Sequence, residues 1–357
     1  WHSTPVSNQK EAYTWDDLIL TKYDFNGREV TYPVKKVKGN EHVYNWLREN
    51  PHRLNLAAIG LIYNDSEISP EDITNITQEL DLYKGLILSR FTLDQKEVFV
   101  KTMVDPKYDV IGWEIESELL LEGKLKIGIR FPYGSSDKTA SNWHNDQEHQ
   151  TILTEQTFQR KLDQTTYHMR LESNQLMKII QNKEHDFSLS FNEEKIALTA
   201  SFYEEKEITI TYEKLFNDNQ VYWQSFWEKT GIVDFDGSTD QRAFELERRI
   251  ILSQYINAIQ NTGSVPPQES GLSCNTWYGK FHLEMHLWHN AYLPQWNQSE
   301  LLKRVIPWYH SNLELAIQNA KRNEYKGARW PKMIGIDGID SPSPIAPLLI
   351  WQQPHII

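Results

Sequence analysis

Residues 97–116 read EVFVKTMVDPKYDVIGWEIE, and this stretch decides the fold class. Glu97–Val104 and Val110–Glu116 are rich in β-branched and aromatic residues, and Asp105-Pro106 between them is a turn signal. Further turn signals stand at Tyr133-Gly134-Ser135-Ser136 and Asn192-Glu193-Glu194. Many short strands at this spacing predict an antiparallel β-sandwich. The other predicted strands are Leu125–Phe131, Tyr167–Glu172, Phe187–Phe191, Ile196–Phe202 and the alternating Glu207–Tyr212.

Helical patterns replace the strand patterns from Asn217 onward. Ser238 with Gln241 three residues later is typical of a helix start. Helices are predicted at 220–229, 239–260, 281–293 and 299–323, with two short pieces at 41–49 and 69–80 and a long exposed loop at 135–159. We therefore expect a β-sandwich over 1–215, linker helices over 216–265 and the opening of a helical domain over 266–357. Two or three helices cannot bury both their faces, so we expect this last domain to be truncated.

The composition excludes several classes of protein. The 357 residues contain no apolar run of 18 or more, so no membrane span is expected. The net charge of -12 argues against a nucleic-acid binder, and the single Cys274 excludes a disulfide framework and a cysteine-based zinc site. The 13 Trp residues are more than a core of this size needs. Because flat rings with polar edges also stack on sugars, this excess favours a carbohydrate ligand.

The densest group of chemically active side chains lies in Trp277–Asn290. On a helix, His282, His286 and His289 would share one stripe, and two histidines at this spacing can bind zinc. The known helical zinc motif needs a glutamate directly after the first histidine, whereas Glu284 comes two residues later. We therefore expect no metal and no other cofactor. Histidine, glutamate and lysine beside Trp288 suit sugar hydroxyls and a stacking plane better.

Two later segments carry a similar mixture of side chains. Tyr325–Met333 combines Arg329 and Lys332 with Trp330, and Trp351–His355 combines two glutamines with a tryptophan and a histidine. Each segment has a plain structural interpretation: a solvated basic loop around a core Trp330, and a capped buried turn. Each also suits the rim of a sugar site.

The chain resembles the glycoside hydrolase families 65 and 95. The resemblance is carried by Asn50–Leu56 with Gly60-Leu61, by Leu80–Leu82 with Gly85-Leu86, by Phe91–Asp94, and by Val98–Thr102 with Asp109–Ile111. It implies an N-terminal antiparallel super-sandwich, linker helices and then the first helices of an (α/α)6 barrel. Phe281–Ala291 is similar to the first inner barrel helix of family 95, where Leu283, Met285 and Trp288 match, while Lys280, His282, Glu284 and His286 replace polar positions.

This resemblance implies a hydrolase that cleaves glycosidic bonds in oligo- or polysaccharides by an inverting acid/base mechanism. The general acid of the family lies further into the barrel, beyond residue 357. Glu284 is the candidate for a direct catalytic part, although a hydrogen bond to a sugar hydroxyl is the more natural role. The expected substrate-binding residues are Lys280, His282, His286, Trp288, Arg329, Trp330, Lys332, Gln352, Gln353 and His355.

Three alternatives remain open from the sequence. A non-catalytic carbohydrate-binding protein predicts sugar binding without turnover. A disaccharide phosphorylase predicts turnover that requires inorganic phosphate. A histidine-rich metalloenzyme predicts activity that is lost to a chelator. The resemblance further implies a bacterial periplasmic or cell-surface location.

Overall fold

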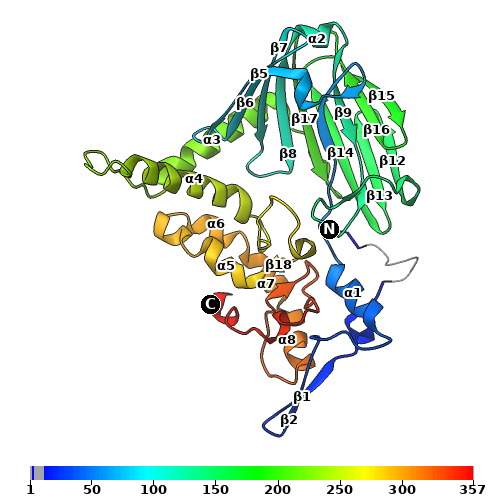
Figure 1. The fold of residues 1–357 in the computed structure, drawn as a ribbon, viewed down its shortest axis with the longest axis vertical. Helices are drawn as coiled ribbons and strands as arrows, with labels where there is room; N and C mark the ends of the chain where they lie inside the picture. The colour runs from blue at the N-terminus through cyan, green and yellow to red at the C-terminus, as the bar shows by residue number, and fades with distance from the viewer. Residues whose placement is uncertain (1, 4–11, 357) are drawn as a thin grey trace. The chain divides into compact units, whose positions relative to one another are not determined.

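The computed structural model describes residues 2–3 and 12–356, which form two compact units. The sheet unit comprises Asn55–Tyr133 and Asn142–Lys229, and the helical unit comprises Trp1–Leu54, Gly134–Ser141 and Thr230–Ile357 (Figure 1). The sandwich is predicted over 1–215, whereas the structure groups Trp1–Leu54 with the C-terminal helices. None of the helices in the described residues combines the length and the apolar character needed to cross a membrane.

The sheet unit contains two antiparallel sheets with one shared core. Strands of the eight-stranded sheet are, in spatial order, β12 (His149–Thr154), β13 (Thr157–Leu162), β14 (Thr165–Ser173), β17 (Lys195–Tyr203), β8 (Val110–Glu116), β7 (Lys96–Val104), β6 (Leu86–Leu93) and β5 (Ile73–Asp81). Those of the five-stranded sheet are β15 (Lys178–Lys183), β16 (Asp186–Ser190), β9 (Leu125–Arg130), β3 (Ala58–Tyr63) and β4 (Ser66–Glu67). Sequence neighbours pair in most places, as short hairpin connections require.

The core between the sheets follows from alternation along each strand. In β9, Leu125, Ile127 and Ile129 are buried while the residues between them are partly exposed, so one face of the strand points inward. Phe187 from β16 and Leu198 from β17 join the same apolar cluster from the two different sheets. Burying each such side chain contributes about 1.5–3 kcal/mol. The predicted sandwich is therefore confirmed as two antiparallel sheets around one core.

Helix α3 (Tyr212–Lys229) covers part of the other face of the eight-stranded sheet. Leu215 of α3 is fully buried with Leu86, Met103 and Val110. Glycine allows the close approach: a Cβ on Gly85, whose φ is +55°, would lie 1.9 Å from the Trp223 indole. The remaining short elements of this unit are η2 (Pro70–Asp72), α2 (Glu118–Leu121) and η3 (Asp146–Glu148), while β10 (Tyr133–Gly134) and β11 (Ser141–Asn142) stand at the unit boundaries.

The helical unit consists of short elements around an aromatic cluster. Phe281, Trp308, Tyr309 and Trp330 are buried together, with Trp308 edge-on to Phe281 at 5.2 Å between ring centroids. Its elements are η1 (Trp15–Asp17), β1 (Thr21–Phe25), β2 (Arg28–Tyr32), α1 (Glu41–Glu49), α4 (Ala243–Asn261), η4 (Trp277–Gly279), β18 (Phe281–His282), α5 (Leu283–Asn290), η5 (Leu293–Trp296), α6 (Ser299–Lys303), α7 (Ile306–Ser311), α8 (Leu313–Arg322), β19 (Met333–Ile334), η6 (Ala346–Leu348) and η7 (Gln353–Ile356).

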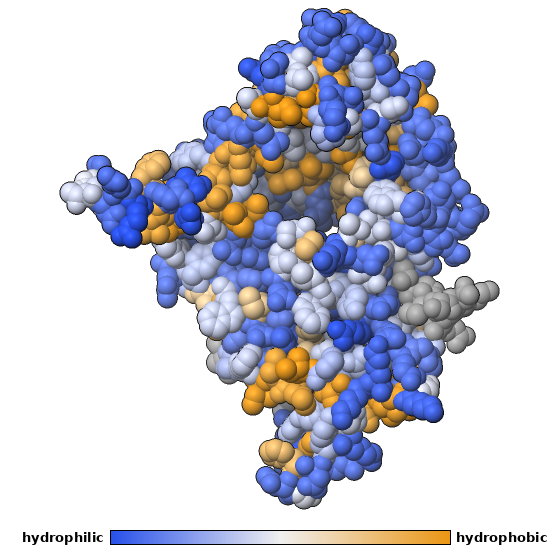
Figure 2. Space-filling model, in the orientation of Figure 1, coloured by the Kyte–Doolittle hydropathy of each residue, from blue (hydrophilic) through white to orange (hydrophobic). Residues whose placement is uncertain are grey.

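Several local predictions need correction. Residues 73–81 form strand β5 and not a helix, and the alternating 207–211 segment has no strand partner, with Ile208 and Ile210 packed beside Leu215. The second half of the predicted 135–159 loop contains β12 and part of β13. The predicted helix 299–323 is divided into α6, α7 and α8, because Pro307 in the first turn of α7 cannot continue a preceding helix. Helix α4 exposes the apolar side chains of Phe244, Leu246, Ile256 and Ile259. Figure 2 shows the hydrophobic colour over this helix.

Candidate functional site

Glu284 lies in the first turn of α5 and forms an ion pair with Lys332. The Glu284 Oε2 to Lys332 Nζ distance is 2.6 Å, and about a sixth of each side chain is exposed. The backbone holds the two residues together, because the Leu283 N–H donates to the Lys332 carbonyl at 2.8 Å. A carboxylate in the first helical turn is also favoured by the helix dipole.

His282 is a buried imidazole near the Glu269 carboxylate. Its Nε2 lies 4.0 Å from Glu269 Oε2, and its Nδ1 has no hydrogen-bond partner among the described residues. Burial lowers the pKa of His282 to about 4; Glu269 and Glu284 oppose this shift, and Lys332 and His289 add to it. His282 is therefore neutral at pH 7. We call Glu269, His282, Glu284, His289 and Lys332 the Glu284 cluster.

The predicted histidine stripe is only partly helical. His282 belongs to β18, which pairs with β19, so only His286 and His289 lie on α5. The Tyr309 hydroxyl bonds to His286 Nδ1 at 2.8 Å and the two rings are nearly parallel, whereas His289 bonds to the backbone of Glu269. His355 Nδ1 bonds to the Leu283 carbonyl at 3.2 Å. His355 also contributes to the lowered pKa of His286, for which burial is the main cause.

The Asp146, His149 and His185 side chains are the one group with metal-ligand spacing in residues 2–3 and 12–356. Their hydrogen bonds do not suit a cation. Buried Arg160 places its guanidinium against His149 Nδ1 at 2.5 Å, and His185 uses both ring nitrogens, with the Thr151 hydroxyl and the Asp146 carbonyl. A guanidinium beside a divalent ion would repel it. The arrangement therefore serves to satisfy a buried arginine.

Lys280, which is predicted to contact a sugar hydroxyl, lies outside the Glu284 cluster. Its side chain is 2 % exposed, and Nζ donates to the carbonyls of Leu47 at 3.1 Å and Asn50 at 2.5 Å. These carbonyls end helix α1, whose last C=O groups lack partners within the helix. Burial lowers the pKa of Lys280 to about 8. The geometry gives Lys280 the role of a helix cap.

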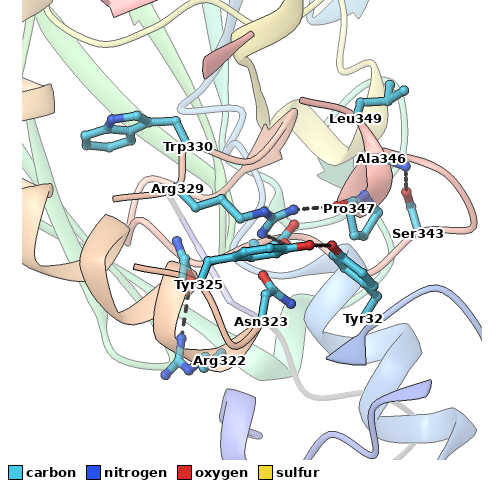
Figure 3. Close-up of polar contacts among 12 residues, drawn as sticks. Tyr32, Arg322, Asn323, Tyr325, Arg329, Trp330, Ser343, Ala346, Pro347 and Leu349 are labelled. Carbon is cyan, nitrogen blue, oxygen red and sulfur yellow. Dashed lines mark hydrogen bonds and ion pairs between the residues drawn. The ribbon is translucent and has the colours of Figure 1, made fainter. Parts of the chain in front are cut away.

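The predicted contact residues Arg329, Trp330 and Gln352 are also buried. Arg329 is buried, with 2.7 Å to the Asp340 carboxylate and 2.6 Å to the Pro347 carbonyl (Figure 3). Trp330 belongs to the aromatic cluster, and its backbone is held by Gln353 and by Gln352, which is 1 % exposed. The sugar-contact roles of these residues stay predictions, because every contact described for them joins parts of the protein.

Of the predicted residues, the structure brings His282, Glu284 and Lys332 together and leaves Trp288 71 % exposed. Trp288 stands four residues after Glu284, on the same helix face. Glu269 is not among the predicted site residues, because nothing in an irregular segment signals a contact with His282. His289 was on the predicted stripe but was not chosen.

No protein-family model and no curated protein matches the chain. Among solved structures it is similar to a bacterial glucoamylase complexed with acarbose, with 11% sequence identity and a TM-score of 0.48 over 80% of this chain. The chain spans 47% of that glucoamylase. It is also similar to a family GH92 α-mannosidase from Bacteroides thetaiotaomicron, with 8% identity, a TM-score of 0.23, and coverage of 58% of this chain and 33% of that one. These neighbours are glycoside hydrolases.

Proposed function

We propose that the protein is a glycoside hydrolase acting on oligo- or polysaccharides, and that the Glu284 cluster is part of its sugar site. The observation that carries the proposal is the presence of two carboxylates near neutral His282: Glu269 lies 4.0 Å from its Nε2, and Glu284 acts on its charge. Carboxylate and imidazole groups at this spacing suit the edge of a sugar ring, where neighbouring hydroxyls donate and accept hydrogen bonds. The partly exposed Trp277 and Trp288 supply apolar planes from the same segment.

The roles within the cluster follow from its contacts. Glu284 accepts a hydrogen bond from a sugar hydroxyl, while Lys332 orients the carboxylate. His282 is buried, and its Nε2 lies beside the Glu269 carboxylate, which it positions for a sugar hydroxyl. An inverting reaction needs an acid and a base about 6.5–9.5 Å apart with a water between them. We assign the principal acid and base to residues outside 1–357, as the family resemblance implies.

The proposal includes the finer architecture and location. The two sheets correspond to the super-sandwich, and α4, α5 and the later helices correspond to the linker and the opening of an (α/α)6 barrel. The family is of the 65/95 type, and the location is periplasmic or on the cell surface. Fractionation of the native host, with immunodetection of the protein, tests the location.

The test is hydrolysis by the protein as its host makes it. Release of reducing ends from a panel of polysaccharides and aryl glycosides should fall at least about tenfold in Glu284→Gln, which corresponds to about 1.4 kcal/mol of transition-state stabilisation. Glu300→Gln is the matched control, because Glu300 also pairs with a lysine at 2.6 Å but is 84 % exposed. Equal activity in Glu284→Gln and wild type would remove the Glu284 cluster from the site.

Two experimental outcomes would contradict hydrolase activity and favour another function. Sugar binding without turnover indicates a carbohydrate-binding protein, and turnover that requires inorganic phosphate indicates a phosphorylase. Both readouts use the same wild-type protein and the same panel of sugars.

A further inference from the structure

Three consecutive residues just before β18 have left-handed backbone. The φ angles of Trp277, Tyr278 and Gly279 are 50°, 62° and 76°. Glycine adopts this conformation freely, and a Cβ on Gly279 would lie 2.5 Å from Arg53 Cγ, so no larger residue fits there. A tryptophan and a tyrosine in this region are strained, and such strain persists only where the surroundings hold it.

The Trp277 indole is held by charged groups from two separate segments. Its Nε1–H donates to the Glu269 carboxylate, and the Arg48 guanidinium lies 5.7 Å from the ring centroid. Arg48 is in the last turn of α1, the helix whose end Lys280 caps. Trp277 is nevertheless 40 % exposed. The backbone strain therefore maintains an oriented aromatic ring that the protein does not bury.

Glu269 connects this ring to the Glu284 cluster. Its carboxylate accepts from the Trp277 indole and also lies 4.0 Å from His282 Nε2. The Glu269 side chain is 42 % exposed, so its remaining lone pairs face solvent. His282 next to it is 98% buried by area and keeps its Nδ1 unpartnered among the described residues.

We propose that Trp277 is the stacking platform of a subsite for an uncharged pyranose residue and that Glu269 accepts hydrogen bonds from its hydroxyls. The proposal rests on the carbohydrate recognition in the proposed function and adds the class of sugar. The charges disfavour an acidic sugar: among the described residues only His282, which is neutral, lies within ion-pair distance of the Glu269 carboxylate, and Lys332 is paired with Glu284. The apolar face of a pyranose covers the ring while its equatorial hydroxyls reach the carboxylate.

Binding of defined oligosaccharides tests the subsite. The probes are maltohexaose, cellohexaose, xylohexaose and mannohexaose as neutral ligands and hexagalacturonate as the anionic one, titrated by calorimetry into the full protein. At least one neutral hexasaccharide should bind, and hexagalacturonate should not. Trp277→Ala should weaken that binding about tenfold or more, as truncation of a central tryptophan contact does. Trp277→Phe, which keeps a ring, should stay within about threefold of wild type.

Trp143→Ala is the matched control for an exposed tryptophan. Trp143 is 37 % exposed and has an arginine, Arg130, 5.1 Å from its ring centroid, but it belongs to the sheet unit and lacks a carboxylate partner in the described contacts. Its removal should leave binding unchanged. Thermal melting of both alanine variants shows whether the fold is kept. On a hydrolysed substrate, Trp277→Ala should raise KM more than it lowers kcat.

The outcomes separate this inference from the proposed function. Equal binding by folded Trp277→Ala and wild type overturns the platform, whether or not the protein hydrolyses sugars. Binding of hexagalacturonate in preference to every neutral probe, or of no probe at all, overturns the assignment of a neutral pyranose. Binding that depends on Trp277 without any hydrolysis supports the subsite and refutes only the hydrolase.

Discussion

Acid should destabilise the helical unit through His286, and one substitution isolates that contribution. The residue is 6 % exposed, its Nδ1 bonds to the Tyr309 hydroxyl, and its Nε2 has no partner among the described residues. Burial lowers the pKa of His286 from 6.5 to about 4. A histidine with a depressed folded-state pKa stabilises the protein fully above pH 6.5, and this stability is lost as the pH falls from 6.5 towards 4.

The magnitude follows from the two pKa values. At pH 5 the unfolded imidazole is almost fully protonated, whereas the folded one is about one-tenth protonated. The difference in proton binding lowers the free energy of unfolding by about 2 kcal/mol at pH 5 relative to pH 8. In His286→Gln this loss is absent, because glutamine does not titrate but can still accept from the Tyr309 hydroxyl.

Urea unfolding at pH 8 and pH 5, followed by tryptophan fluorescence, measures the loss for both proteins. The other buried histidines, such as His282, titrate in both proteins and cancel in the comparison. The wild type should lose about 2 kcal/mol more than His286→Gln between the two pH values. The reasoning is refuted if the two proteins lose the same amount.

Three further changes test the packing and the buried charges. Arg329→Met should destabilise the helical unit by about 3–5 kcal/mol, because it leaves the Asp340 carboxylate buried without its cation. Chemical denaturation measures the loss of unfolding free energy. A loss no larger than that for an exposed ion pair would contradict this prediction. Phe187→Ala should cost about 3–5 kcal/mol of sheet-unit stability, and a smaller loss would mean that the two sheets collapse around the gap. Zinc at micromolar concentration should not raise the melting temperature, because the Arg160 guanidinium already contacts His149 Nδ1. A saturable increase in melting temperature would show that Asp146, His149 and His185 do bind a metal ion.

Strands enclosed by turn signals could be predicted because local sequence determines them. The predicted strand Val110–Glu116 has the observed bounds, since both of its edges pair with neighbouring strands, β17 and β7, of one sheet. The polar, acidic segment 73–81 looked helical, but β5 lies at the edge of the sheet, where most of its residues are exposed. Its pairing with β6 overrides the local preference.

The site was predictable only where its members are close in sequence. His282 and Glu284 could be identified together because a single residue, Leu283, separates them, whereas the ion pair of Glu284 with Lys332 joins two distant segments and has no signal in the sequence. The buried charges Lys280 and Arg329 look like surface residues in a sequence, because charged side chains are rarely fully buried. Their partners are carbonyls and a carboxylate that only the tertiary fold supplies.

The division of the chain determines the order in which the two units can form during synthesis. All residues of the sheet unit lie between 55 and 229, so that unit can fold as soon as Lys229 leaves the ribosome. Helix α1, in contrast, must wait more than 200 residues for Lys280, whose ammonium satisfies the carbonyls at its end. A nascent chain arrested shortly after residue 229 should therefore hold a protease-resistant sheet unit, while residues 12–54 are still cleaved.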